Sequence, residues 1–285
     1  MNSKFNKKTV CPAKINLFLH ITGKRPDNYH ELITLMCCIG IYDTLWFTFK
    51  TDKTTVSCDD PQVPDNGNNL AYKAANCFFR KLNSPEHVGI SIEKHIPVAA
   101  GLGGGSSNAA TVLRELNEYY NYPFSREQLA DMGLSIGADV PFFIYQKPAI
   151  ATGIGEALKP CYGLEAYEIL LIFPGFSVST ADAYKKLNLG LTKYEKKLNY
   201  SLFQDPSFNL QSHLHNDLES ITIAQYPEII AVKESLLNYG ATGALMSGSG
   251  PSVFGIFPDS DAAQKTKLAL SKNKKWKVYL VKLLV

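Results

Sequence analysis

The sequence lacks several features that would assign it to a familiar class at once. It contains no uninterrupted apolar run approaching the roughly 18 residues that cross a membrane. Its first residues, MNSKFNKKTVCPAK, contain no apolar core of a secretory signal. Internal repeats and low-complexity tracts are also missing. We therefore expect a cytoplasmic protein with no membrane partner.

Cysteine and histidine patterns typical of metal sites are missing too. The six cysteines of the 285 residues include no Cys-x-x-Cys pair and no Cys/His cluster at zinc-ligand spacing. We expect buried free thiols in a reducing compartment. His213 and His215 form a His-x-His pair without an evident third ligand. Both are expected at the surface, and the metal ligands stay unknown.

Basic residues are in slight excess but are not concentrated. The net charge is +3, and lysines and arginines are scattered along the chain. This pattern favours a partner that is an anionic small molecule rather than a nucleic acid. The densest run, KNKKWK at 272–277, is expected to be a solvated loop before an edge strand. With 45% hydrophobic residues, the chain can bury a sizeable core.

Short alternating and helical patterns follow one another without a regular strand–helix–strand rhythm. Strands are expected within 12–23, 32–50, 54–60, 87–97, 167–175, 241–257 and 276–284. Helices are expected within 69–82, from about 106 to 120, and within 125–140, 222–240 and 260–272. This mixture favours an α+β fold over a doubly wound sheet. We expect two domains, 1–160 and 161–285, with a hinge near YGLEAYE at 162–168.

The stretch PVAAGLGGGSSNAAT at 97–111 holds four glycines immediately before a helical pattern. Glycine in an ordered element costs about 0.5–1 kcal/mol relative to alanine, which suggests a ligand as compensation. Backbone N–H groups of such a loop, together with a helix N-terminus, bind phosphate well. No lysine precedes the serine as in a Walker A loop, and Ser106 replaces the last glycine of a dinucleotide fingerprint. The HRD and DFG motifs of protein kinases are absent.

A second glycine cluster and two charged residues also stand out. Gly248 and Gly250 flank a serine in MSGSGPSVFG, which predicts a tight turn that could close over the same phosphates. Lys14, ahead of a strand, and Asp139, in GADVPFF, are by themselves typical of a surface lysine and a cap residue. Together with a phosphate loop they suit phosphoryl transfer, which needs positioning and charge neutralisation.

Three blocks resemble the motifs of the GHMP kinases: PAKINLFLHITGKRPDNYHELITLM, PVAAGLGGGSSNAAT with GADVPFF, and MSGSGPSVFG. The first block resembles the branch that phosphorylates a hydroxyl of a diphosphocytidyl-methylerythritol in the non-mevalonate isoprenoid pathway. The resemblance implies a two-lobed GHMP kinase fold, with an N-terminal ribosomal-protein-S5-like lobe, a C-terminal ferredoxin-like lobe and the active site between them. It covers about 11–257.

The resemblance also implies roles for individual residues. Lys14 and Asp139 are the expected catalytic residues, with Asp139 as general base. Asparagine at 28, where the family usually has glycine, should tolerate the same turn. ATP, with Mg²⁺, is expected at Pro97, Val98, Ala99, Ala100, Gly101, Leu102, Gly103, Gly104, Gly105, Ser106 and Ser107, and at Asn69, Leu70 and Lys94. The diphosphocytidyl substrate is expected at Asn16, Tyr29, His30, Thr180 and Tyr184.

Two alternatives stay open beside this interpretation. A related kinase acting on mevalonate or homoserine would share the glycine loop, but those substrates carry no base to stack on Tyr29. An RNA-binding module is conceivable because the N-terminal lobe resembles a ribosomal protein, but it has no need of two glycine loops with Lys14 and Asp139. We expect a monomer or homodimer, with a small-molecule partner and no nucleic acid.

Overall fold

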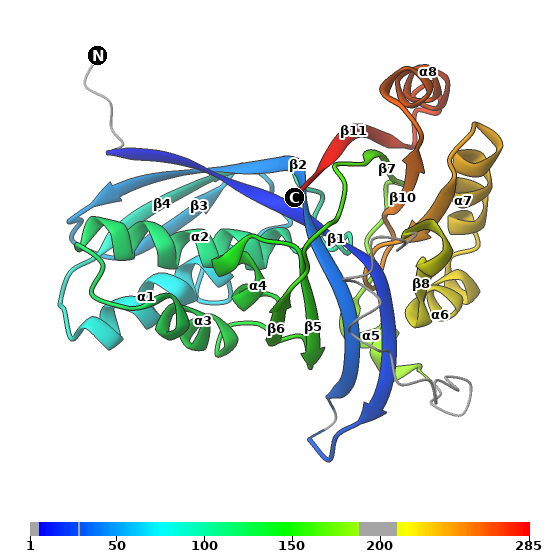
Figure 1. The fold of residues 1–285 in the computed structure, drawn as a ribbon. Coiled ribbons are helices and arrows are strands. Elements are labelled where there is room, and N and C mark those ends of the chain that lie inside the picture. The colour runs from blue at the N-terminus through cyan, green and yellow to red at the C-terminus, as the bar shows by residue number, and fades with distance from the viewer. Residues whose placement is uncertain (1–5, 28, 188–209) are drawn as a thin grey trace. The chain divides into compact units, whose positions relative to one another are not determined.

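The computed structural model describes residues 6–27, 29–187 and 210–285, so Asn28 lies outside the described residues. The chain forms two compact units, coloured along the chain in Figure 1. Unit 1 consists of Met1–Ala13, Ile41–Val98 and Gly103–Gln146, and unit 2 of Lys14–Gly40, Ala99–Leu102 and Lys147–Val285. The units interleave along the chain, so the cut at residue 160 stays a prediction. The expected hinge, 162–168, lies within unit 2.

Unit 1 packs four helices with a small sheet (Figure 1). Its sheet pairs the second half of β2 (His30–Phe49) antiparallel with β4 (Val88–Glu93), which pairs parallel with β3 (Thr55–Cys58). The helices are α1 (Leu70–Leu82), α2 (Gly104–Tyr119), α3 (Arg126–Leu134) and α4 (Val140–Tyr145). Helix α2 contacts the other three, and its central residues are almost all buried.

Local sequence signals explain where these helices begin. The Asn69 side chain accepts a hydrogen bond from the Ala71 N–H at the start of α1. The predicted cap of α3 is confirmed, because Ser125 and Gln128 form a reciprocal capping box. The predicted apolar face of α1 is also confirmed, with Phe78 and Phe79 buried.

Unit 2 contains a mixed sheet in which the first half of β2 pairs with β11, followed by β7, β10 and β9. Strand β1 (Lys7–Lys24) contributes residues to both units. The other strands of unit 2 are β5 (Ala149–Gly153), β6 (Ala157–Pro160), β7 (Glu168–Phe173), β8 (His215–Asn216), β9 (Gly243–Met246), β10 (Val253–Phe257) and β11 (Lys277–Leu284). The helices are α5 (Thr180–Lys185), the 3-10 turn η2 (Leu210–His213), α6 (Asp217–Gln225), α7 (Glu228–Asn238) and α8 (Ser260–Leu270). Strand β1 pairs with β2 and parallel with β8, while the β5–β6 hairpin extends from β2.

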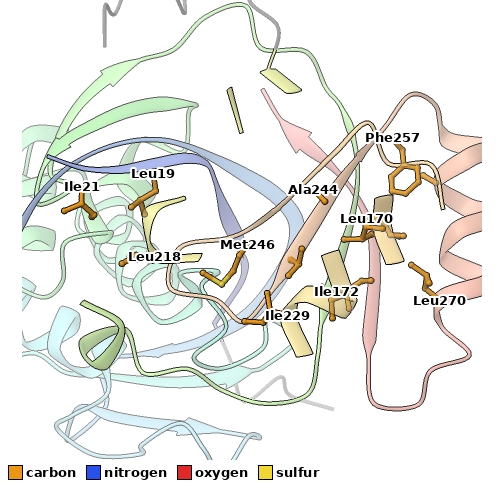
Figure 2. Close-up of a cluster of buried hydrophobic side chains, with 14 of the residues drawn as sticks. Leu19, Ile21, Leu170, Ile172, Leu218, Ile229, Ala244, Met246, Phe257 and Leu270 are labelled. Carbon is orange, nitrogen blue, oxygen red and sulfur yellow. The ribbon is translucent and has the colours of Figure 1, made fainter. Parts of the chain in front are cut away.

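The core of unit 2 lies between this sheet and helices α6, α7 and α8. Figure 2 shows apolar side chains from β7, β9 and β10 converging with those of the helices. Leu170, Ile172 and Ile229 have no exposed surface. Burying each such side chain contributes about 1.5–3 kcal/mol. This packing fixes the hairpin formed by β9 and β10, whose turn carries the second glycine cluster.

The α+β prediction is confirmed, but three local expectations were wrong. The helix expected at 222–240 is two helices, because Pro227 supplies no N–H and disfavours helical geometry at Tyr226. Strand β11 is not an edge strand, since it pairs with both β7 and β2. Helix α2 begins at Gly104, earlier than expected. The predicted glycine after α7 is confirmed, as Gly240 has φ +99°.

The cysteine prediction holds with one exception. All six cysteines are free thiols, and five are buried, whereas Cys58 is partly exposed. Burial raises the pKa of Cys11 and of Cys37 to about 12. Within the described residues, no helix combines the length and apolar character that a membrane span needs. The loop at 272–277 is an exposed turn up to Lys275, as expected.

Candidate active site

The middle of the first glycine loop is held in unit 2 by backbone hydrogen bonds. The Lys14 N–H donates to the Leu102 carbonyl at 3.0 Å. Carbonyls of the two preceding alanines accept from later segments: Ala99 from Val178 at 3.1 Å and Ala100 from Ser252 at 3.3 Å. These bonds place the loop beside the start of the Lys14 segment of β1 and beside the β9–β10 turn.

Gly101 makes the closest approach between the two glycine loops. Its φ is +77°, and an added Cβ would lie 2.0 Å from the Ser247 carbonyl oxygen. No side chain fits there, because backbone would have to move. The Ser247 hydroxyl donates to the Gly101 carbonyl at 3.0 Å and accepts from the Asn16 N–H at 3.3 Å. Gly101 and the second glycine turn are thus in direct contact in unit 2.

A buried hydrogen-bond chain orients Lys14. Its ammonium donates to Asn16 Oδ1 at 2.5 Å, and Asn16 Nδ2 donates to Thr34 Oγ1 at 2.8 Å. Thr34 in turn donates to the Phe18 carbonyl at 2.6 Å. Lys14 is 4% exposed, so it is not the surface lysine that its position alone suggested. Because Thr34 fixes the amide of Asn16, it fixes the acceptor offered to Lys14.

The second glycine turn is held by side chains that sequence reasoning missed. Asn216 donates to the carbonyls of Met246 at 2.8 Å and Gly248 at 2.7 Å. Its Oδ1 accepts from the Leu218 N–H, so it also caps α6. Thr222 donates to the Ser249 carbonyl at 3.2 Å. In sequence these are ordinary polar residues in HNDLES and ITIA, and only the fold reveals that they are buried.

Helix α5 joins two of the predicted substrate positions. Thr180 Oγ1 lies 2.9 Å from the Ser249 hydroxyl. One turn later, the Tyr184 ring lies 5.3 Å from the ring of His30, centroid to centroid. Burial, with a smaller effect of Lys24, lowers the pKa of His30. Tyr29 is 57% exposed, so its predicted stacking role stays a prediction.

In unit 1 the end of the glycine loop opens helix α2 without a side-chain cap. Gly103 is the N-cap, with φ +68°, and no acidic residue lies in the first turn. The first N–H groups of a helix lack intrahelical partners and carry partial positive charge. An added Cβ on Gly104 would lie 2.8 Å from Lys94 Nζ, and one on Gly105 would lie 3.5 Å from Leu70. The end of the glycine loop, Lys94 and Leu70 therefore lie together in unit 1, and their role in nucleotide binding stays a prediction.

Asp43 is a buried anchor for this helix start. It has no exposed surface, and its Oδ2 accepts from Lys94 Nζ at 2.7 Å and from Asn108 Nδ2 at 2.9 Å. Its Oδ1 accepts from the N–H groups of His95 and Ile96, both at 2.9 Å. Removing one partner of such a buried pair costs about 3–5 kcal/mol. Sequence reasoning missed Asp43, although a single carboxylate within the apolar run IYDTLWF is a signal that could have revealed it.

The remaining unit 1 positions differ in character. Ser107 is fully buried, and its hydroxyl has no hydrogen-bond partner among the described residues. Asp139 is half-buried at the N-cap position of α4, but its side chain makes no capping bond. An added Cβ on Gly137 would lie 3.8 Å from Ser106 Oγ, so the Asp139 loop adjoins the glycine-loop serines. Asn69 is occupied as the cap of α1 and donates to the Pro64 carbonyl.

Comparison with known proteins explains this arrangement. The model of the GHMP kinases N terminal domain matches residues 69–147, and that of the GHMP kinases C terminal domain matches 196–275. A curated relative from Syntrophus aciditrophicus is 44% identical over 96% of this chain and 98% of its own length. The chain belongs to the GHMP kinase family.

That relative is named 4-diphosphocytidyl-2-C-methyl-D-erythritol kinase, as is one from Clostridium botulinum that is 40% identical over 88% of this GHMP kinase and 91% of its own length. A crystal structure of 4-(cytidine 5'-diphospho)-2C-methyl-D-erythritol kinase superposes with a TM-score of 0.81 at 32% identity, covering 97% of this chain and 99% of that one. Homoserine kinase from Cytophaga hutchinsonii, at 18% identity, has a TM-score of 0.74 over 99% and 98% of the two chains, and shares the fold.

Proposed function

We propose that this GHMP kinase transfers the γ-phosphoryl group of ATP to a hydroxyl of 4-diphosphocytidyl-2-C-methyl-D-erythritol. The observation that carries the proposal is near-full-length identity of 40–44% with relatives of that name. The Lys14–Asn16 chain beside two linked glycine loops supports it. Mevalonate and homoserine kinases share the fold at 18% identity or less, which supports neither as the activity.

The glycine loop supplies the phosphate site. The uncapped start of α2 offers N–H donors, and glycine at 104 keeps side-chain atoms out of the space beside Lys94. Anions bind such helix starts through N–H groups and the helix dipole. Lys94 is paired with Asp43, which suggests that it positions the loop rather than supplying an unpaired charge.

Residues of unit 1 also fit a magnesium ion. The buried Ser107 hydroxyl has no hydrogen-bond partner among the described residues and sits in the first turn of α2. Phosphate-bound Mg²⁺ takes hydroxyl and phosphate oxygens as ligands. When bound, the ion would neutralise charge on the phosphates. Ser107 would hold it there.

Asp139 acts as general base in this proposal. Its carboxylate accepts the proton of the substrate hydroxyl, and the hydroxyl oxygen forms a bond to the γ-phosphorus. The bond between the γ-phosphorus and the bridging oxygen breaks, and ADP leaves with that electron pair. Asp139 is suited to this because its loop adjoins the glycine-loop serines in unit 1.

Lys14 supplies positive charge for the transferring phosphoryl group. Its ammonium is oriented by Asn16, and an added Cβ on Gly248 would lie 3.4 Å from Nζ. The second glycine turn therefore leaves space beside the ammonium. A preorganised charge in a buried site stabilises charge that develops during transfer. The His30–Tyr184 pair offers a ring surface and a neutral imidazole for the cytosine base.

A coupled ADP-release assay tests the proposal with the diphosphocytidyl substrate, mevalonate and homoserine as separate acceptors. We expect turnover with the first alone. Asp139→Asn should lower kcat by about 10²–10⁴-fold, while calorimetry still detects both substrates. Asp131→Asn, which changes an exposed carboxylate on α3, is the matched control and should keep full activity. Turnover of mevalonate or homoserine would contradict the substrate, and normal kcat in Asp139→Asn would contradict the base.

A further inference from the structure

A second cluster of potential ligands lies in unit 2, formed by His20, His215 and Asp217. His20 is near the end of β1, His215 begins β8, and Asp217 is the first residue of α6. Parallel pairing of β1 with β8, through Phe18 opposite His215, brings the two histidines together. Their rings stack with centroids 4.4 Å apart and planes 13° apart. Only His215 of the His-x-His pair belongs to this cluster, and the fold supplies His20 and Asp217 in place of His213.

The ligand atoms of the three side chains already lie close together. One nitrogen from each histidine and one carboxylate oxygen are all within 4.8 Å of one another. His215 Nε2 is 2.7 Å from Asp217 Oδ1. Metal–nitrogen and metal–oxygen bonds of about 2.0–2.2 Å place tetrahedral ligand atoms about 3.3 Å apart. Small side-chain movements are thus enough to close a shell around one ion.

Two of the three ligands are held in place by the fold, and the third can adjust. His20 is 4% exposed, on a strand buried on both faces. Asp217 Oδ2 accepts the Ile21 N–H at 2.6 Å, which leaves Oδ1 directed at His215. Such an outer hydrogen bond orients a ligating carboxylate. His215, whose side chain is 46% exposed, is the ligand that can rotate.

We propose that His20, His215 and Asp217 form a binding site for one divalent transition-metal ion of the zinc type, distinct from the magnesium that accompanies ATP. Two imidazole nitrogens and one carboxylate oxygen suit Zn²⁺ or Co²⁺, whereas Mg²⁺ favours oxygen ligands alone. Three protein ligands leave a fourth position for water.

The site adjoins the clamp on the second glycine turn. Asn216, between the two ligands in sequence, donates to the carbonyls of Met246 and Gly248. A metal ion would link β8 and the start of α6 to β1. It would thereby stabilise the hydrogen bonds of Asn216 to the second glycine turn. Binding to the folded state alone raises the unfolding temperature as metal concentration rises.

Zinc titration of the tag-free, chelator-treated full chain tests the proposal. Calorimetry should give one Zn²⁺ per chain, the unfolding temperature should rise, and Co²⁺ should give the visible absorption of a tetrahedral site. Excess Mg²⁺ should not displace Zn²⁺. His215→Gln and Asp217→Asn should each weaken binding by more than the roughly 10–100-fold that loss of an outer-shell partner costs, because each removes a ligand.

His213→Gln is the matched control, because His213 belongs to the same His-x-His pair but is not part of the cluster. It should bind Zn²⁺ as the unaltered chain does. Equal weakening in His213→Gln, or unchanged binding in His215→Gln, would overturn the proposal. So would failure of the unaltered chain to bind Zn²⁺ at millimolar concentration.

Discussion

Gly248→Ala tests whether the space beside Lys14 is needed for catalysis. Its effect on kcat can be distinguished from its effect on stability, which comes from backbone strain in the second glycine turn. The new Cβ would lie 3.2 Å from Asn16 Oδ1, 3.3 Å from the Gly101 carbonyl oxygen and 3.4 Å from Lys14 Nζ. Each contact is slightly too short, so the neighbours must move by a few tenths of an ångström. Since a 1 Å misplacement can lower a rate about 100-fold, we expect kcat to fall about tenfold.

The stability effect of this substitution should be modest. At φ +56° the residue is in the left-handed helical region, where alanine costs about 1–2 kcal/mol. Gly163→Ala is the control, because Gly163 has φ +83° and an added Cβ there meets no atom of the described residues within 4 Å. It should lose comparable or greater stability by chemical denaturation and keep its kcat. If both variants lose kcat equally, or if Gly248→Ala retains it, the assigned role of the turn beside Lys14 is wrong.

Three further outcomes are expected. Tyr29→Ala should weaken binding of the cytidine substrate by about 1–3 kcal/mol in calorimetry and leave ATP affinity unchanged; equal losses would make it a folding residue. Lys24→Gln should raise the pKa of His30, moving the acid limb of kcat/KM to higher pH; an unmoved limb would exclude His30 as its source. At pH 8 a thiol reagent should modify Cys58 in the folded protein and Cys37 only in guanidinium, and prompt reaction of Cys37 would contradict its burial.

Local patterns were enough to predict most helices, because caps and apolar stripes act over a few residues. Ser125 with Gln128, and the glycine after α7, are signals of this kind. Strand position was harder, since whether β11 is an edge depends on β2 and β7, far away in sequence. Pro227 was visible in the sequence, and its disruption of the predicted helix follows from its missing N–H.

The candidate site also contains residues that the sequence motifs indicated and residues that only the fold revealed. The glycine loops stood out by composition, whereas Lys14 and Asn16 were singled out only through the resemblance to the GHMP kinase motifs. The motifs did not identify Asn216, because its role is to donate hydrogen bonds to the carbonyls of Met246 and Gly248, which are distant in sequence. Nor did they show that Lys94 is paired with Asp43, since that contact joins the residue after β4 to β2.

Because the two units interleave along the chain, they become complete at different times during synthesis on the ribosome. Every residue of unit 1 has been made once Gln146 is added, whereas unit 2 needs the chain to its end at Val285. Synthesis at about 5–20 residues per second makes that interval about 7–30 s. Strand β5 follows Gln146 almost at once and pairs with Leu35 and Met36. Throughout the interval, however, the buried Cys38 and Ile39 of β2 lack their partners Leu283 and Leu284 in β11. Slower translation would therefore prolong the exposure of an early strand to aggregation, while leaving the finished fold unchanged.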